Sequence, residues 1–177
     1  ETVFNLTEGD QTFLTYDDAT HTFTRHYPDG MRVHFNPDGT HDTTLDAYGN
    51  KTAYVYADGR LARIEIYPAG DSQPRWTWTL AYSSTSNLQS LISITDPAGR
   101  MTTLTIDEHG DLVSILQPGQ TTPMTFLYDA EHRMTHEQDE RGNVTTNVYD
   151  EWGALQRTLL PPRPVYDPLA DRFTICL

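Results

Sequence analysis

One segment sets the pattern for most of the chain: Ala53-Tyr54-Val55-Tyr56-Ala57-Asp58-Gly59-Arg60-Leu61-Ala62-Arg63-Ile64. Before the Asp-Gly turn, Tyr54 and Tyr56 are two residues apart, so on a strand both side chains point to one face of a sheet. After the turn, Leu61 and Ile64 are three residues apart, which does not fit an alternation of two. The segment therefore predicts a β-hairpin with either a bulge or a loss of strand pairing just beyond its turn.

Similar turns recur along the chain, and several carry a proline before the glycine: Pro28-Asp29-Gly30, Pro37-Asp38-Gly39, Pro68-Ala69-Gly70 and Pro97-Ala98-Gly99. Proline holds φ near about −65°, which suits the second position of a type I turn and is incompatible with a type I′ turn. Glycine then takes the left-handed position, which predicts a three-residue hairpin loop with a glycine bulge. The turn residues of the repeat are predicted to be Gly30, Gly39, Gly59, Gly99, Gly110, Gly142 and Gly153.

The spacing of the turns defines the fold class. Between Gly30 and Gly70 the turn glycines follow one another in steps of nine to eleven residues, the spacing of one strand and one tight turn in a β-meander. A longer interval after Gly70 contains the clearest alternating strand, from Trp76 to Tyr82, followed by a Ser-rich turn. No segment keeps apolar residues at helical spacing over a dozen positions. The sequence predicts an all-β antiparallel meander of tandem hairpins.

We expect the β-repeat region to extend over residues 1–160, with looser strands over residues 1–22. Residues 161–177 are expected to form a Pro-rich extended tail. The chain begins at Glu1 without an initiator Met or an apolar signal segment, and we expect it to be a fragment of a longer polypeptide. Cys176 is its single cysteine, so no internal disulfide can form.

The charge balance narrows the range of partners. There are 12 basic and 25 acidic residues, giving a formal net charge of −13. Because no run of Lys or Arg interrupts this acidity, nucleic acid and anionic membrane are not expected partners. No stretch approaches the roughly 18 apolar residues of a membrane helix. Asp at turn positions, where its side chain binds the local backbone, accounts for much of the acidity.

Several units of the chain resemble Rhs or YD repeats: Asp96-Pro97-Ala98-Gly99-Arg100-Met101-Thr102, Tyr128-Asp129-Ala130-Glu131-His132-Arg133-Met134, Asp139-Glu140-Arg141-Gly142-Asn143-Val144-Thr145-Thr146 and Tyr149-Asp150-Glu151-Trp152-Gly153-Ala154-Leu155. Repeats of this family carry a Tyr-Asp followed by a Gly-Arg-Leu type turn and a later Asp-Pro-x-Gly type turn. The resemblance covers about residues 23–160 and is interrupted between residues 67 and 91.

In that family, tandem hairpins wind as a spiral β-sheet into a hollow shell, in bacterial Rhs polymorphic toxins and in the B and C components of insecticidal toxin complexes. Related repeats occur in teneurins. The resemblance implies a structural segment of a large exported or cell-surface protein, part of a shell that encloses or presents a C-terminal toxin or other cargo. The chain has too few repeats to close a shell, and it has no match to the Asp-Pro-x-Gly-Leu region where such shells are cut. Both departures suit an early portion of a shell.

The histidines predict no metal site. His26 and His34 flank one turn and can lie diagonally on one face at about 7–8 Å, but no clear third ligand accompanies them. His132 and His136 would be about 13 Å apart on a strand, too far to share a metal. The Asp-rich turn at residues 107–111 lacks the spacing of a calcium loop. We therefore expect no metal and no cofactor.

The sequence also predicts no enzyme, because it contains no nucleophile elbow, glycine-rich phosphate loop or Cys-His pair. A carboxylate pair facing one groove would be needed for a hydrolase. The alternative function is a carbohydrate-binding module, in which exposed aromatic rings stack on sugars. Its candidate residues are Trp76, Trp78, Tyr82, Tyr54 and Tyr56. The competing interpretation is that these rings fill the interior side of the sheet.

Overall fold

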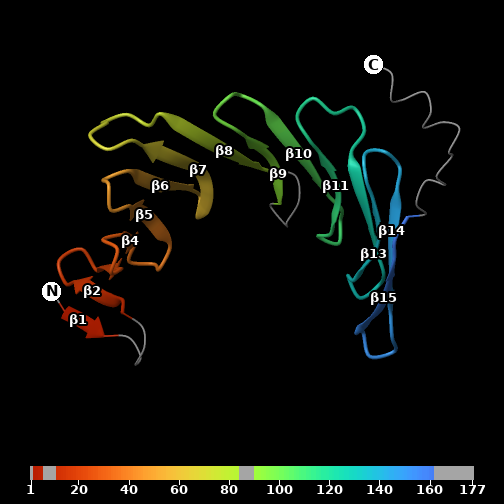
Figure 1. Cartoon of the computed structure of the whole chain (residues 1–177), viewed down its shortest axis with the longest axis horizontal. Coiled ribbons are helices and arrows are strands. Elements are labelled where there is room, and N and C mark those ends of the chain that lie inside the picture. Colours follow the sequence, from red (N-terminus) through yellow and green to blue (C-terminus); the bar gives the residue numbers. More distant parts are fainter. Residues whose placement is uncertain (1, 6–10, 84–89, 162–177) are drawn as a thin grey trace, which may run out of the picture. The chain divides into compact units, whose positions relative to one another are not determined.

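The computed structural model describes residues 2–5, 11–83 and 90–161. These residues form 15 β-strands and no helix, and the strands make an antiparallel sheet in the order of the sequence (Figure 1). The predicted all-β antiparallel meander is confirmed. The turn expected near residues 8–10, most of the Ser-rich turn and the tail from residue 162 onward lie outside the described residues.

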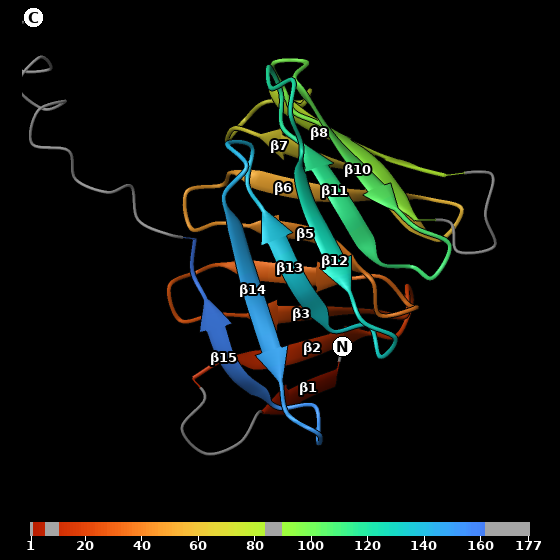
Figure 2. The ribbon, with the colours of Figure 1, turned by 90° about the vertical axis from the view of Figure 1, so that its right-hand side faces the viewer.

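The chain divides into two compact units, Glu1–Leu104 and Thr105–Leu177. The strands of the first unit are β1 Thr2–Asn5, β2 Phe13–Asp17, β3 Thr22–His26, β4 Arg32–Phe35, β5 His41–Leu45, β6 Lys51–Ala57, β7 Arg60–Tyr67, β8 Trp76–Tyr82, β9 Leu91–Thr95 and β10 Met101–Ile106, which ends in the second unit. The second unit continues with β11 Leu112–Leu116, β12 Met124–Tyr128, β13 Met134–Gln138, β14 Val144–Tyr149 and β15 Leu155–Leu159 (Figure 2).

The register separates an apolar face from a polar one. Tyr54 of β6 lies opposite Ile64 of β7, and Ile64 lies opposite Trp78 of β8. Cross-strand neighbours on one face contact each other, so these large side chains form a continuous apolar row. On the other face of the same strands, Glu65 lies opposite Thr77. The alternation read from the sequence therefore corresponds to two chemically different faces.

Of the two alternatives predicted beyond the central turn, the structure has the bulge. Tyr54 pairs with Ile64, whereas Tyr56 pairs with Leu61, so the β7 strand contains one extra residue between these pairs. The extra residue places Leu61 and Ile64 on the same face as the two tyrosines. Comparable register shifts occur in the hairpins β4–β5, β8–β9, β12–β13 and β14–β15.

Most turns adopt the predicted loop. At the first proline turn, Gly30 N donates to Tyr27 O at 3.0 Å and Tyr27 N donates to Met31 O at 3.0 Å, with φ of Gly30 at 88°. The central turn differs, because Asp58 and Gly59 both have positive φ, 51° and 74°. These two residues form a two-residue loop of the type I′ kind, since no proline prevents it and Asp tolerates the left-handed region.

Few side chains are deeply buried. Among the described residues only Phe126, at 9% exposure, and Thr15, at 7%, are buried. Large apolar side chains are mostly half-buried, and none is completely enclosed within the described ranges. Each unit is therefore a sheet without a closed hydrophobic core, stabilised by contacts between neighbouring strands and turns.

Tyrosine hydroxyls tie hairpins to the strands before them. The hydroxyls of Tyr82, Tyr128 and Tyr149 donate hydrogen bonds of 2.9 Å to the backbone carbonyls of Leu61, Leu112 and Met134, respectively. Each acceptor lies two residues after the left-handed residue of an earlier turn, namely Gly59, Gly110 and His132. The same structural position in these three hairpins is thus held by the same contact.

Candidate functional site

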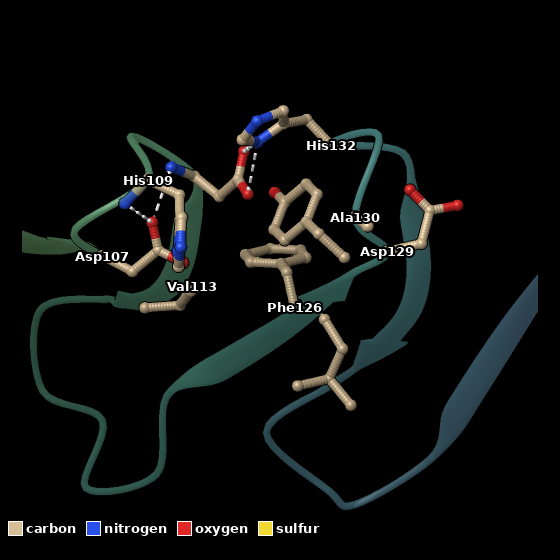
Figure 3. Close-up of a pocket in the computed structure, with 10 residues that line it drawn as sticks. Asp107, His109, Val113, Phe126, Asp129, Ala130 and His132 are labelled. Atoms are coloured by element: carbon tan, nitrogen blue, oxygen red, sulfur yellow. Dashed lines mark hydrogen bonds and ion pairs between the residues drawn. The ribbon is translucent and has the colours of Figure 1, made fainter.

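A hollow in the second unit lies between the turn at residues 107–111 and the turn at residues 129–133 (Figure 3). Its volume is about 440 Å³. The lining combines carboxylates, imidazoles and aromatic rings: Asp107, His109, Asp111, Val113, Phe126, Leu127, Tyr128, Asp129, Ala130 and His132. The two turns therefore bring together residues that are about 20 positions apart in the sequence.

Aspartates stabilise both turns by binding backbone amides. Asp107 Oδ1 accepts hydrogen bonds from the amides of His109 and Asp111 at 2.9 and 3.0 Å. Asp129 Oδ1 accepts from the amides of Glu131 and Arg133, both at 3.0 Å. The same arrangement is present at four other turns, those of Asp46, Asp96, Asp139 and Asp150. The Asp of the Tyr-Asp pair is thus a turn residue.

These hydrogen bonds stabilise the ionised carboxylates. The pKa of Asp107 lies below its usual value, mainly because the amide of Asp111 donates to it, with the amide of His109 adding to the effect. The pKa of Asp129 is lowered in the same way, first by the amide of Arg133 and then by its guanidinium. Hydrogen bonds to the charged form of a carboxyl favour ionisation. The cavity therefore contains negative charge at neutral pH.

His132 has an unusual backbone conformation for its residue type. Its φ is 61°, at the turn position where the neighbouring turns carry Gly110 and Gly153. Its Nδ1 lies 3.0 and 2.9 Å from the two carboxylate oxygens of Asp111, in the preceding turn on the same edge of the sheet (Figure 3). This hydrogen bond, together with the charge of Asp111, raises the pKa of His132. The contact offsets the cost of a side chain in the left-handed region.

His109 lies on the opposite side of the same opening. The centroids of the His109 and His132 rings are 6.4 Å apart, and His109 Nδ1 lies 3.7 Å from Asp107 Oδ2. Within residues 2–5, 11–83 and 90–161, no group of three or more His, Cys, Asp or Glu side chains is placed to hold a metal ion. The described part of the chain also contains no helix long and apolar enough to cross a membrane.

Aromatic rings form the apolar part of the lining. Phe126 is the most buried apolar side chain among the described residues, and Tyr128 donates its hydroxyl to Leu112 O. The pKa of Tyr128 is raised by burial first, and then by the charges of Asp111 and Asp107. Both carboxylates therefore influence the electrostatic potential around the tyrosine oxygen.

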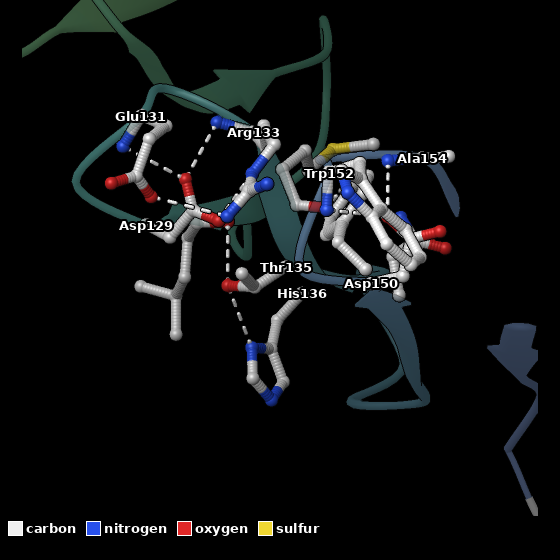
Figure 4. A network of polar contacts seen from close by, with 12 residues as sticks. Asp129, Glu131, Arg133, Thr135, His136, Asp150, Trp152 and Ala154 are labelled. Atoms are coloured by element: carbon white, nitrogen blue, oxygen red, sulfur yellow. Dashed lines mark hydrogen bonds and ion pairs between the residues drawn. The ribbon is translucent and has the colours of Figure 1, made fainter. Parts of the chain in front are cut away.

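A second polar network lies within the turn at residues 129–133, next to the following turn on the same edge (Figure 4). Arg133 Nε donates to Asp129 Oδ2 at 2.8 Å, and Arg133 Nη2 donates to Glu131 Oε2 at 3.1 Å. The guanidinium lies 5.0 Å from the centroid of the Tyr149 ring. A Cβ at Gly153 would lie 2.9 Å from Arg133 Nη1. The absence of a side chain at Gly153 therefore leaves the space that the guanidinium uses.

The candidate residues of the alternative carbohydrate-binding hypothesis all belong to the first unit, whereas this cavity is in the second. Trp76 is 43% exposed, has the Arg75 guanidinium 5.1 Å from its ring centroid, and borders a shallow hollow together with Trp78. Tyr82 uses its hydroxyl to hold Leu61 O.

The two remaining predicted tyrosines are both half-buried. Tyr54 stacks on His41 with ring centroids 4.0 Å apart. Tyr56 lies opposite Leu61 in the register. The structure thus brings Trp76 and Trp78 to one hollow, whereas Tyr54 and Tyr82 make specific contacts within the sheet.

The histidines weighed as metal ligands have separate partners. His26 Nε2 lies 3.1 Å from Thr15 Oγ1, and its ring stacks on Phe13 at 4.4 Å between centroids. His34 Nδ1 lies 2.8 Å from Asp42 Oδ2. The cavity around His132 was not predicted from the sequence. The signal that could have indicated it is a histidine at a turn position where the neighbouring turns have glycine.

No family model matches the chain, and no curated protein matches it. Solved structures with a similar arrangement of strands include a crystal structure of TcdB2-TccC3-Cdc42. The match is 14% identical in sequence, extends over 82% of this chain and 11% of the matched protein, and has a TM-score of 0.36. The Tc holotoxin pore of Photorhabdus luminescens is 14% identical over 76% of this chain and 10% of the matched protein, with a TM-score of 0.36. The crystal structure of TcdB2-TccC3 without its hypervariable C-terminal region is 14% identical over 75% of this chain and 10% of that protein, with a TM-score of 0.35. The chain spans about a tenth of the length of these proteins.

Proposed function

We propose that the chain is a structural repeat segment of a large exported or cell-surface Rhs/YD-repeat protein. In this role it forms part of a β-sheet shell that encloses or presents a C-terminal toxin or other cargo. The observation that carries the proposal is a repeated hydrogen bond between neighbouring hairpins. The Tyr128 and Tyr149 hydroxyls each donate to a backbone carbonyl of the hairpin before their own. A contact that links successive repeats can be continued indefinitely along a chain.

The distribution of burial supports the same role. With only two buried side chains among its described residues, the sheet is stabilised mainly by contacts between neighbouring strands and not by a closed core. A sheet of sequential antiparallel hairpins can instead serve as a wall, with neighbouring repeats covering its ends. Among the residues that the structure describes, the edge strands β1 and β15 each pair with one strand. Unpaired edges favour further strand addition. A wall of this kind requires no catalysis.

The size of the native polypeptide tests the proposal directly. An antibody raised against residues 11–83 would be applied to lysate and culture medium of the source organism. A band several times larger than the 20.1 kDa of this chain is expected, in the medium or at the cell surface. A band near 20.1 kDa would contradict the shell segment.

Encapsulation has its own test on the parent polypeptide. Limited proteolysis of the native protein should leave its C-terminal cargo intact, whereas proteolysis after mild denaturation should degrade it. Equal cleavage of the cargo in both states would show that the repeats present the cargo without enclosing it.

A further inference from the structure

The cavity in the second unit has more hydrogen-bond acceptors than donors. The two oxygens of Asp111 face a single donor, Nδ1 of His132, at 3.0 and 2.9 Å. Asp107 uses Oδ1 for two backbone amides, whereas its Oδ2 lies 3.7 Å from His109 Nδ1. That distance exceeds a hydrogen bond. Both carboxylates can therefore accept further hydrogen bonds from a group that enters the cavity.

The apolar part of the lining suits a planar cation. Phe126 and Tyr128 line the same cavity as Asp107 and Asp111. The faces of aromatic rings attract cations, and a guanidinium stacks on them more readily than an ammonium does. A guanidinium also offers five N–H donors in one plane, which suits carboxylates contributed by one turn. The lining itself contains no Lys or Arg.

His132 is the group that can supply positive charge to Asp111 from within the chain. The charged and titratable groups around its imidazole are Asp111, Asp107, Asp129 and His109. Asp111 raises the pKa of His132 most strongly, and Asp107 and Asp129 add to this effect. Protonated His132 therefore satisfies Asp111, and neutral His132 leaves its carboxylate without a cationic partner.

We propose that this cavity binds the guanidinium of an arginine side chain from a partner protein, with Asp107 and Asp111 as acceptors and Phe126 and Tyr128 as the stacking surface. Protonated His132 competes with the arginine for Asp111. Binding is therefore stronger above the pKa of His132 than below it. The net charge of −13 favours the approach of a basic partner.

The test is an NMR titration of the 177-residue chain with N-acetyl-arginine methylamide. At about pH 8.5, where neutral histidine predominates, we expect saturable shifts of the Tyr128 and His109 resonances. The uncharged analogue N-acetyl-citrulline methylamide should cause none. Asp111→Asn should weaken binding at least about tenfold, because the carboxylate charge that pairs with the guanidinium is lost. Asp139→Asn, in a turn outside the cavity, is the matched control and should leave the affinity unchanged.

The competition with His132 has a separate readout. Affinity at about pH 5.5 should be at least about fivefold lower than at about pH 8.5, as expected for two coupled binding equilibria. His132→Asn, which tolerates the left-handed region, should remove this difference. By reciprocity, the ligand should lower the pKa of His132 measured from its imidazole resonances.

Three results would overturn the proposal: equal binding of the citrulline analogue, equal weakening by Asp139→Asn, or an unchanged pH dependence in His132→Asn. Far-UV circular dichroism shows whether Asp111→Asn remains folded. If Asp111→Asn does not fold, Asp107→Asn is used as the test variant, because the asparagine oxygen can still accept the hydrogen bonds from the turn amides while the charge is lost. Failure of that variant to weaken binding would also contradict the site. None of these results depends on the chain being part of a shell.

Discussion

Replacing Tyr128 by phenylalanine tests whether tyrosine hydroxyls stabilise the stack of hairpins. The substitution keeps the ring beside Phe126 and removes the 2.9 Å hydrogen bond to Leu112 O. A neutral intramolecular hydrogen bond contributes about 1 kcal/mol to the free energy of unfolding, and an unsatisfied buried acceptor costs up to about 3 kcal/mol. Because the acceptor lies next to an open cavity that water can enter, we expect the lower value, about 1 kcal/mol.

Urea unfolding measures this loss. With an m-value of about 1–3 kcal/mol/M, a loss of about 1 kcal/mol lowers the midpoint by roughly 0.3–1 M. The matched control is Tyr48→Phe, because Tyr48 is 86% exposed at a turn and a change there should stay within about 0.5 kcal/mol. An unchanged midpoint for Tyr128→Phe, or an equal decrease for Tyr48→Phe, would refute the stabilising role of the hydroxyl.

Four further substitutions test the turns. Gly153→Ala and Gly142→Ala both place a side chain at positive φ, 84° and 85°, at a cost of about 1–2 kcal/mol. Gly153→Ala should lower the melting temperature more, because its Cβ would displace the Arg133 guanidinium from its ion pairs with Asp129 and Glu131. Equal decreases would contradict this. His132 has a raised pKa, so its contribution is present below its unfolded pKa of about 6.5 and is lost as pH rises through the higher folded pKa. His132→Asn should therefore lower the urea midpoint more at about pH 6 than at about pH 9, and a constant difference would disprove the contact. Asp139 has a lowered pKa, caused first by the Asn143 side chain, so its contribution is present above its unfolded pKa and is lost as pH falls through the lower folded pKa. Asp139→Ala should accordingly destabilise the chain at about pH 7 but much less at about pH 2, as acid and neutral urea titrations would show.

Local patterns predicted the strands and most of the turns well. The alternation between Trp76 and Tyr82 identified β8, because side chains of a strand point to opposite faces in turn. The irregular spacing of Leu61 and Ile64 predicted either a bulge or a loss of pairing, and the structure has the bulge, in which an extra residue places both side chains on one face. Proline before glycine predicted the three-residue loop at Gly30, since proline restricts φ.

The same reasoning did not extend to the turn at Asp58 and Gly59. The expectation of a three-residue loop came from turns with proline, which this turn lacks, and both residues adopt positive φ. Asp and Gly are compatible with either type of turn, so strand pairing on both sides decides between them. In this case Ala57 pairs directly with Arg60.

The cavity around His132 was beyond prediction for a different reason. His132 and Asp111 are 21 residues apart, and their contact depends on the register of the intervening strands and on the bulge between β12 and β13. A shift of one residue in that register would move the side chains to the other face. The sequence could indicate only that a histidine occupied a glycine position.

The sequence by itself determined the order of strands and turns, because alternation and backbone restriction act between residues close together in the chain. It also determined the acidity of the turns, since Asp binds the amides of its own turn. Only the tertiary structure decided which turns meet, because that depends on register accumulated over several strands. The pairing of His132 with Asp111, the space at Gly153 for Arg133 and the bond from Tyr128 to Leu112 all join separate hairpins. Their geometry exists only once the strands between them have paired.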